Sequence, residues 1–217
     1  MNVMITGSSR GMGREAAIKF LSEGHKVWGI DIAESSIDDP KYYHYVCDIS
    51  KDKLPDQVDD IHVLINNAGV QGTENDMEVN LRGLIRCTEK YALKNSAIRA
   101  VINQAAASGT TGADFGEYVA SKGGVIAYTR YTAKEIAKYG ATCNSISFGG
   151  VISPVNWDVM NDMKKWNKIM SMTPLQKWAT STEAADWIYF LATVNKSCTA
   201  QDIIIDNGEM FNHKFIW

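Results

Sequence analysis

Tyr118 and Lys122 are the two residues whose types and spacing best suit proton transfer. Four positions apart on a helix, their side chains share one face. A phenol has a pKa of about 10, and lowering it to about 7 requires roughly 4 kcal/mol of differential stabilisation of the phenolate. A neighbouring ammonium group supplies part of this stabilisation. A solvated helix face is the ordinary explanation of an isolated Tyr-x-x-x-Lys pair, so the assignment depends on the surrounding motifs.

A glycine-rich turn near the start of the chain, TGSSRGMG, is the second chemical feature. Gly7, Gly11 and Gly13 lie between a short apolar segment and a helical one, as in turns that bind a pyrophosphate at a helix N-terminus. Asp31 follows about 20 residues later, where a dinucleotide fingerprint places the carboxylate that binds ribose hydroxyls. Such a carboxylate repels a 2′-phosphate, whereas Arg10 would attract one. We therefore expect NAD rather than NADP, the alternative being that Asp31 is an ordinary turn residue.

Short β-rich segments alternate with helical ones along the chain. The expected strands lie at 2–6, 26–31, 42–48, 62–69, 99–105, 142–148 and 202–208, and the expected helices at 14–24, 77–94, 117–139 and 182–194. This alternation predicts βαβ crossovers, an α/β fold class and a mostly parallel sheet with helices on both faces. Gly24 and Gly140 are predicted helix C-caps, and Thr180 with Glu183 has the spacing of a capping box.

Length and composition narrow the class of protein. The 217 residues are 45% hydrophobic and contain no linker-like stretch, which predicts one domain over 1–217. A net charge of -3 without a basic block argues against nucleic-acid binding, and no apolar run nears the roughly 20 residues that cross a bilayer. Strand-like residues begin at Val3, which leaves no room for a leader, so a cytoplasmic protein is expected. The scattered Cys47, Cys87, Cys143 and Cys198 predict reduced, packed thiols and no metal site.

Several motifs, in order along the chain, resemble those of the classical short-chain dehydrogenase/reductase family. Besides TGSSRGMG and YVASK they include CDIS, NNAG, VNLRG, SFGGVIS and TAQDIIIDNG, so the resemblance covers nearly the whole chain. It implies a three-layer Rossmann-type doubly wound fold with a mostly parallel seven-stranded sheet. It also implies an NAD(P)-dependent enzyme that interconverts a secondary alcohol and a ketone.

The resemblance assigns roles to individual residues. Tyr118 is similar to the family's general acid/base, and Lys122 to the residue that binds the nicotinamide ribose and lowers the tyrosine pKa. Asn80 is similar to an asparagine that bends a helix and orders a water near the lysine. Phe148 stands where the family has proline, and Ser153 stands where it usually has threonine. The implied cofactor contacts are Gly7, Ser9, Arg10, Gly11, Met12, Gly13, Asp31, Asp48, Ile49, Asn67, Ala68, Gly69, Tyr118, Lys122, Gly149, Val151 and Ser153.

One catalytic group that the family would supply is absent. In the family an asparagine at the end of the fifth strand is followed three residues later by a serine that hydrogen-bonds the substrate oxygen, and counting from Asn103 reaches Ala106. Removing such a donor typically costs about 10²–10³ in turnover. Three explanations remain open: serine was replaced on purpose to inactivate an enzyme, Ser108 or Thr110 has taken over its role, or the chain is a dinucleotide-binding regulatory protein without catalysis. The first is preferred, because the other three catalytic positions are retained.

The segment at about 153–175 is rich in tryptophan and methionine, and in the family this region forms a lid over the substrate. We expect a hydrophobic or cyclic small-molecule substrate, with Ser108, Gly150, Trp157 and Met160 as its contacts. The alternative is that the large side chains pack the lid against the body of the protein. The segments at 77–94 and 117–139 correspond to helices through which relatives assemble, so a homo-oligomer, either a tetramer or a dimer, is expected.

Overall fold

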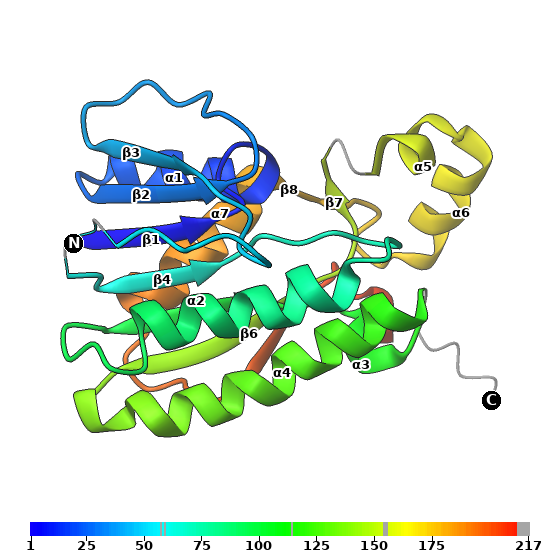
Figure 1. Cartoon of the computed structure of the whole chain (residues 1–217). Coiled ribbons are helices and arrows are strands. Elements are labelled where there is room, and N and C mark those ends of the chain that lie inside the picture. The colour runs from blue at the N-terminus through cyan, green and yellow to red at the C-terminus, as the bar shows by residue number, and fades with distance from the viewer. Residues whose placement is uncertain (57, 59, 114, 154–155, 212–217) are drawn as a thin grey trace.

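Seven parallel strands form the central sheet of the computed structural model, which describes residues 1–56, 58, 60–113, 115–153 and 156–211 (Figure 1). Their order across the sheet is β3-β2-β1-β4-β5-β6-β9, so the chain starts in the middle and winds outward in both directions. The prediction of a mostly parallel, seven-stranded, Rossmann-type sheet is confirmed, and every pair of neighbours is parallel. The strands are β1 (Asn2–Thr6), β2 (Lys26–Asp31), β3 (Tyr42–Val46), β4 (Val63–Asn66), β5 (Ala100–Gln104), β6 (Thr142–Phe148) and β9 (Asp202–Ile205).

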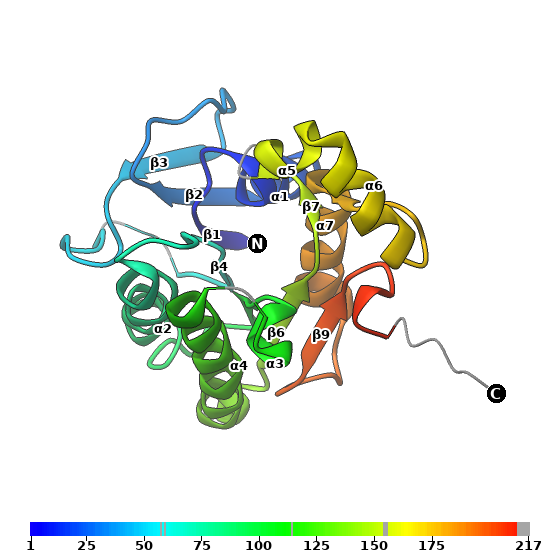
Figure 2. The ribbon, with the colours of Figure 1, turned by 90° about the vertical axis from the view of Figure 1, so that its right-hand side faces the viewer.

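Helices cover both faces of the sheet and make it the middle of three layers (Figures 1 and 2). On one face lie α1 (Gly11–Ser22) and α7 (Ser181–Tyr189), which continues into the π-helical η4 (Phe190–Val194). On the other face lie α2 (Leu84–Tyr91), preceded by the π-helical η1 (Glu78–Gly83), and α4 (Gly116–Ile136), followed by the 3-10 turn η2 (Ala137–Tyr139). Because both faces are covered, β1, β4, β5 and β6 are apolar or buried nearly throughout.

The smaller elements gather at the carboxyl ends of the strands, the edge that faces the viewer in Figure 2. They are α3 (Ser108–Thr111), α5 (Trp157–Asn161), α6 (Met163–Met172), the 3-10 turn η5 (Glu209–Phe211), and the separate parallel pair β7 (Val151–Ile152) and β8 (Ala179–Thr180). In open α/β sheets this edge is where ligands bind.

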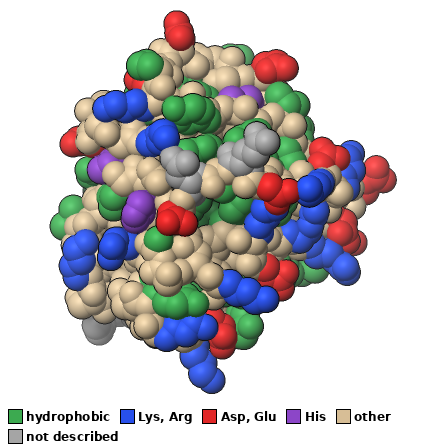
Figure 3. Space-filling model, turned by 60° about the vertical axis from the view of Figure 1, so that its left-hand side comes forward, with side chains coloured by type: hydrophobic (Ala, Val, Ile, Leu, Met, Phe, Trp, Pro, Cys, Tyr) green, Lys and Arg blue, Asp and Glu red, His purple; other side chains and the backbone are tan. Residues whose placement is uncertain are grey.

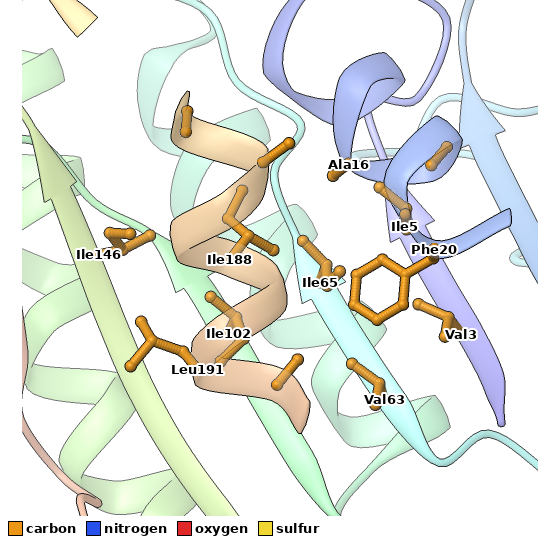
Figure 4. Packing of buried hydrophobic residues seen from close by; sticks show 14 of the residues in the cluster. Val3, Ile5, Ala16, Phe20, Val63, Ile65, Ile102, Ile146, Ile188 and Leu191 are labelled. Carbon is orange, nitrogen blue, oxygen red and sulfur yellow. The ribbon is translucent and has the colours of Figure 1, made fainter. Parts of the chain in front are cut away.

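A layer of fully buried side chains joins α1 and α7 to the sheet (Figure 4). Phe20 of α1 packs beside Ile65 of β4, and Ile188 of α7 packs near Ile102 and Ile146 of β5 and β6. Complete burial of a side chain of this size stabilises the fold by about 1.5–3 kcal/mol. The core therefore holds the strand ends, and the loops that leave them, in fixed positions.

The helix ends follow the predicted local chemistry. Gly140 is the C-cap residue of η2, whereas Gly24 follows Glu23, the C-cap residue of α1. Their φ values of +68° and +83° are the left-handed conformation that suits a residue without a Cβ. At the start of α7 the Glu183 amide donates to Thr180 Oγ1 over 3.1 Å, while the Thr180 amide donates to Glu183 Oε2 over 2.9 Å. The predicted capping box is confirmed.

The four cysteines are all free thiols, as expected. Cys47, Cys87 and Cys143 are buried, and burial raises the pKa of Cys87 to about 12. These three side chains belong to the cluster packed under α2 and α4. They therefore serve as small apolar packing groups.

The surface seen in Figure 3 mixes both signs of charge. Lysine and arginine side chains on this face lie among aspartate and glutamate side chains, and histidines are scattered between them. Throughout the part of the chain that the structure describes, no helix combines the length and the hydropathy needed to cross a membrane.

Candidate active site

Two adjoining cavities open at the carboxyl ends of the strands. The larger has a volume of about 440 Å³ and is lined by the loops that follow β1, β2, β3 and β4. The smaller has a volume of about 190 Å³ and lies between the ends of β5 and β6 and the start of α4. Their combined size suits a small organic ligand. They form one continuous site, because five residues line both cavities: Met12, Asn67, Gly69, Val70 and Ser153.

The glycine-rich turn forms the floor of the larger cavity. Gly7 and Gly11 adopt φ of +69° and +58°, which only glycine adopts without strain. Gly13 lies behind the turn, where a Cβ would come within 2.1 Å of the Gly7 carbonyl oxygen. Any side chain at position 13 would therefore push the turn out of place.

Helix α1 points its N-terminus at this cavity. Its N-cap residue, Arg10, makes no side-chain capping hydrogen bond, and its first turn carries no acidic residue. The first amide groups of a helix have no partner within the helix, and the helix dipole makes this end positive. With the exposed Arg10 on the cavity wall, the arrangement suits a pyrophosphate.

Asp31 lines the larger cavity and is held in position by two backbone amides. The Ser9 amide donates to its Oδ2 over 2.9 Å, and the Ala33 amide donates to its Oδ1 over 3.0 Å. The first bond ties the carboxylate to the glycine-rich turn. Each oxygen keeps a further lone pair for a ligand hydroxyl.

Asp48 and Ile49 follow β3 and line the same cavity. Partial burial opposes the charged form of Asp48, but the Ser50 hydroxyl and amide and the Lys51 ammonium outweigh it and lower the pKa. The Ile49 carbonyl accepts a hydrogen bond from the Arg86 guanidinium, which fixes the loop to α2.

The side chain of Asn67 lies in the wall shared by the two cavities and has one acceptor that no described residue uses. Its Nδ2 donates to the carbonyl oxygens of Thr6 and Gly7 at 3.1 and 3.0 Å, and the neighbouring Ala68 amide donates to Thr6 Oγ1 at 3.0 Å. Its Oδ1 is buried and has no hydrogen-bond partner among the described residues, which is costly unless a ligand supplies a donor. A nicotinamide dinucleotide fits this continuous site. The site offers it a glycine-rich floor, an open helix N-terminus, a fixed carboxylate and an acceptor left unpaired by the described residues.

Lys122 lies at the bottom of the smaller cavity and is 3% exposed. Its Nζ donates to the Gln104 carbonyl oxygen over 3.0 Å. Burial lowers its pKa from the ordinary 10.5 to about 8, because removal from water disfavours the ammonium, and the charge of Asp76 partly opposes this shift. Lys122 therefore carries its proton near neutral pH but holds it weakly.

Tyr118 lies one helical turn before Lys122, and both residues line the smaller cavity. The distance from Lys122 Nζ to the centre of the Tyr118 ring is 5.7 Å. The Tyr118 carbonyl accepts a hydrogen bond from Ser121 Oγ over 2.7 Å, which anchors this first turn of α4. The structure thus brings the predicted phenol and ammonium together in one cavity.

Asn80 lies behind the cavity, buried in the wide turn of η1. Its side chain accepts from the Val70 amide over 2.8 Å and donates to the Val70 carbonyl over 2.9 Å. It also donates to Ser121 Oγ over 3.1 Å. Through these bonds Asn80 joins the loop after β4 to the turn of α4 that carries Tyr118.

Ala106 lines the smaller cavity together with Tyr118 and Lys122, just beyond the end of β5. It is 7% exposed. Ser108 and Thr110 belong to the one-turn helix α3, and neither is among the described residues that line the cavity. The methyl group of Ala106 therefore occupies the wall where the sequence pattern of the family would place a hydroxyl.

The loop after β6 closes one side of the site. Gly149 and Val151 line the smaller cavity, and Ser153 lines both. Gly150 instead packs against Trp178, where a Cβ would come within 1.9 Å of the indole ring. The other expected substrate contacts, Trp157 and Met160, lie on α5 outside the described lining, and Trp157 is 58% exposed. Within the expected lid, residues 154–155 lie outside the described residues.

Sequence reasoning missed three amide side chains of the smaller cavity, those of Gln71, Gln104 and Asn156. Gln104 had a visible signal, since it follows Asn103 as the second polar residue at the carboxyl end of a strand that begins with three apolar residues. Asp76 was also missed; it is 1% exposed and accepts hydrogen bonds from the Gly72 and Thr73 amides and the Thr73 hydroxyl. Across the described residues no group of three or more His, Cys, Asp and Glu side chains is arranged to hold a metal ion.

Known proteins share this architecture. A family model described as Enoyl-(Acyl carrier protein) reductase matches residues 7–209. The 3-oxoacyl-(acyl-carrier-protein) reductase FabG of Staphylococcus epidermidis is 27% identical over 240 residues, covering 95% of this chain and 98% of that protein. The structure of a 4-hydroxyisoleucine dehydrogenase complexed with NADH is 22% identical, has a TM-score of 0.86, and is matched over 96% of this chain and 98% of its own. A dehydrogenase structure from Agrobacterium tumefaciens with bound NADP is 23% identical, with a TM-score of 0.84 and 96% of each chain covered.

Proposed function

The chain belongs to the short-chain dehydrogenase/reductase family, and on that premise we propose that it is an NAD(H)-dependent enzyme interconverting a secondary alcohol and a ketone. Membership in the family makes it an oxidoreductase that uses NAD or NADP. The observation that carries the finer proposal is the smaller cavity, which is lined by Tyr118 and Lys122 and adjoins the larger cavity.

The residues of the chain divide the work of proton transfer. Tyr118 exchanges a proton with the substrate oxygen, and the Lys122 ammonium stabilises its phenolate form. Asn80 acts through other groups, because it holds the α4 turn against the loop after β4. The cofactor, when bound, supplies or accepts the hydride at the substrate carbon.

The proposed preference for NAD rests on Asp31, whose two oxygens are already oriented by backbone amides. Asp31→Asn keeps the shape of the side chain but removes the charge that repels a 2′-phosphate, and it leaves Arg10 in place to attract one. We expect the ratio of the dissociation constants of NADPH and NADH to fall by about tenfold or more, because repulsion between close charges is worth at least about 1.4 kcal/mol. Quenching of tryptophan fluorescence measures both constants.

Asp38→Asn is the matched control, because Asp38 is an exposed carboxylate seven residues further along that does not line either cavity. It should leave the ratio unchanged. An unchanged ratio in Asp31→Asn would contradict the proposed role of this carboxylate.

The proposed substrate is a hydrophobic or cyclic ketone. The smaller cavity carries apolar side chains, those of Val70, Phe148 and Val151, which suit a ring or an alkyl chain. Helices α5 and α6 follow Asn156 of the cavity wall along the chain and lie near the carboxyl ends of the strands (Figure 2), and we propose that residues 153–175 act as the lid of the cavity. The amides of Gln71 and Asn156 add polar points of contact.

The test of the proposed function is oxidation of NADH with a panel of cyclic and linear ketones, in the native chain and in Tyr118→Phe. Loss of the phenol proton should lower turnover by about 10²–10⁴, while the NADH dissociation constant changes little. Tyr131→Phe is the matched control on the exposed side of the same helix. Equal turnover in the native chain and Tyr118→Phe would rule out Tyr118 as the acid/base.

A second candidate function is favoured by one observation, the methyl group of Ala106 on the cavity wall. A chain that binds dinucleotide without a complete set of donors to the substrate oxygen would suit a regulatory protein. Tight NADH binding without oxidation by any ketone, in the native chain and after restoration of serine at position 106, would support this alternative.

A further inference from the structure

Gln104 is fixed at the carboxyl end of β5 by its own backbone. Its carbonyl oxygen accepts the 3.0 Å hydrogen bond from Lys122 Nζ, and it lies in register with Ile146 of β6. The preceding Asn103 donates to Thr129 of α4 over 2.9 Å, so its side chain faces α4. Because side chains alternate along a strand, that of Gln104 faces the opposite side of the sheet, toward α1.

The Gln104 amide lies where the two cavities meet. Its Nε2 donates to Met12 Sδ over 3.8 Å, and Met12 lines both cavities. Its Oε1 is buried, and among the described residues it has no hydrogen-bond partner. A thioether sulfur is a weak acceptor, so both ends of this amide have unused hydrogen-bonding capacity.

The chemistry of the unused atoms indicates the ligand group. Oε1 needs a donor, which a ketone cannot provide, and the hydroxyl of a secondary alcohol would use only one of the two ends of the amide. A carboxamide offers an NH₂ donor and a carbonyl acceptor side by side, and therefore complements a glutamine amide through two hydrogen bonds. We propose that Gln104 binds the carboxamide of the nicotinamide nucleotide and so selects the reactive end of the cofactor. This inference rests on the proposed function and adds a recognition residue to it.

The test compares NAD⁺ with 3-acetylpyridine adenine dinucleotide, in which a methyl group replaces the carboxamide NH₂. The analogue keeps the acceptor but cannot donate to Oε1. We expect the native chain to bind NAD⁺ about tenfold more tightly than the analogue, the usual scale of one hydrogen bond with its desolvation. Calorimetry gives both dissociation constants without any turnover.

Two variants at position 104 isolate the acceptor. Gln104→Met removes it while keeping a similar length, and should bring the ratio of the two constants to about one. Gln104→Glu keeps an oxygen that accepts from the NH₂ group, and should retain most of the preference. Gln201→Met removes an exposed amide that lines neither cavity and should leave the ratio as it is in the native chain.

The outcomes separate this inference from the function on which it rests. A preference for NAD⁺ that persists in Gln104→Met overturns the role of Gln104, because Asn67 Oδ1 or another group must then receive the NH₂ hydrogens. Equal binding of both ligands by the native chain overturns it too. Failure of the native chain to bind either nucleotide contradicts the proposed function itself. Loss of the preference in Gln104→Met but not in Gln104→Glu or Gln201→Met supports the inference.

Discussion

Ala106→Ser is expected to raise the turnover number for ketone reduction by about 10²–10³, the usual value of one preorganised donor to a developing oxyanion. Position 106 lines the smaller cavity together with Tyr118 and Lys122 and is nearly buried, so a hydroxyl there would be shielded from competing water. In such surroundings a hydrogen bond that strengthens as charge develops acts mainly on the transition state. The gain should therefore appear in kcat, with a smaller change in KM.

The same measurement decides among the three explanations for the alanine. A gain of this size would mean that the rest of the machinery is intact and that the chain lacks only the hydroxyl. An unchanged rate in an active native chain would mean that another group already donates to the substrate oxygen. Ser108 and Thr110 are poorly placed for that role, because neither is among the described residues that line the cavity.

Ala107→Ser is the matched control for this variant. Ala107 is the next residue along the chain, and it does not line either cavity. Its amide donates to the Phe148 carbonyl over 3.1 Å, so its backbone is fixed in the same way as the rest of the strand end. Ala107 is half-buried, so a serine there adds the same hydroxyl outside the site and should leave turnover within about a factor of two, or about 0.5 kcal/mol. An equal gain in both variants would contradict a specific role for position 106.

The features that sequence reasoning predicted are those encoded within a few neighbouring residues. Apolar runs such as NVMIT predict buried parallel strands, and the capping pair Thr180 and Glu183 satisfies its own helix end. The glycine-rich turn is equally local, because positive φ at Gly7 and Gly11 is a property of the turn itself. In each of these elements, the residues that determine the local structure belong to the element itself.

The features that were missed depend on contacts between distant parts of the chain. The importance of Gln104 comes from Met12 of α1 and from the absence of a partner for Oε1 among the described residues. Asp76 matters because the loop after β4 buries it near Lys122. In the expected lid, the tryptophans and methionines are visible in the sequence. Their positions relative to the cavity, however, depend on how α5 and α6 pack.

Lys122→Met is expected to stabilise the folded chain while lowering turnover by at least about 10², because the phenolate of Tyr118 loses its neighbouring charge. Burial lowers the lysine pKa from 10.5 to about 8. Each pKa unit corresponds to about 1.4 kcal/mol, so at neutral pH the buried ammonium lowers the free energy of unfolding by about 3 kcal/mol. Lys122→Met also loses the hydrogen bond to the Gln104 carbonyl, which lowers the free energy of unfolding by about 1 kcal/mol. The net stabilisation at pH 7 is about 2 kcal/mol, or about 4–8 °C in Tm for a chain of this size.

The pH dependence separates this cause from better packing. Below about pH 8 the lysine is protonated in both the folded and the unfolded chain, so the full cost of the buried charge is present. Between pH 8 and 10.5 the unfolded chain binds more protons than the folded one, so the native protein gains stability as pH rises and the advantage of methionine shrinks. Urea unfolding at pH 7 and at high pH measures both differences, with the exposed Lys134→Met of the same helix as control. If the stabilisation by Lys122→Met is the same at both pH values, better packing of methionine causes it and the buried ammonium does not. If the stabilisation disappears at high pH, the positive charge that the native chain keeps beside Tyr118 lowers the free energy of unfolding.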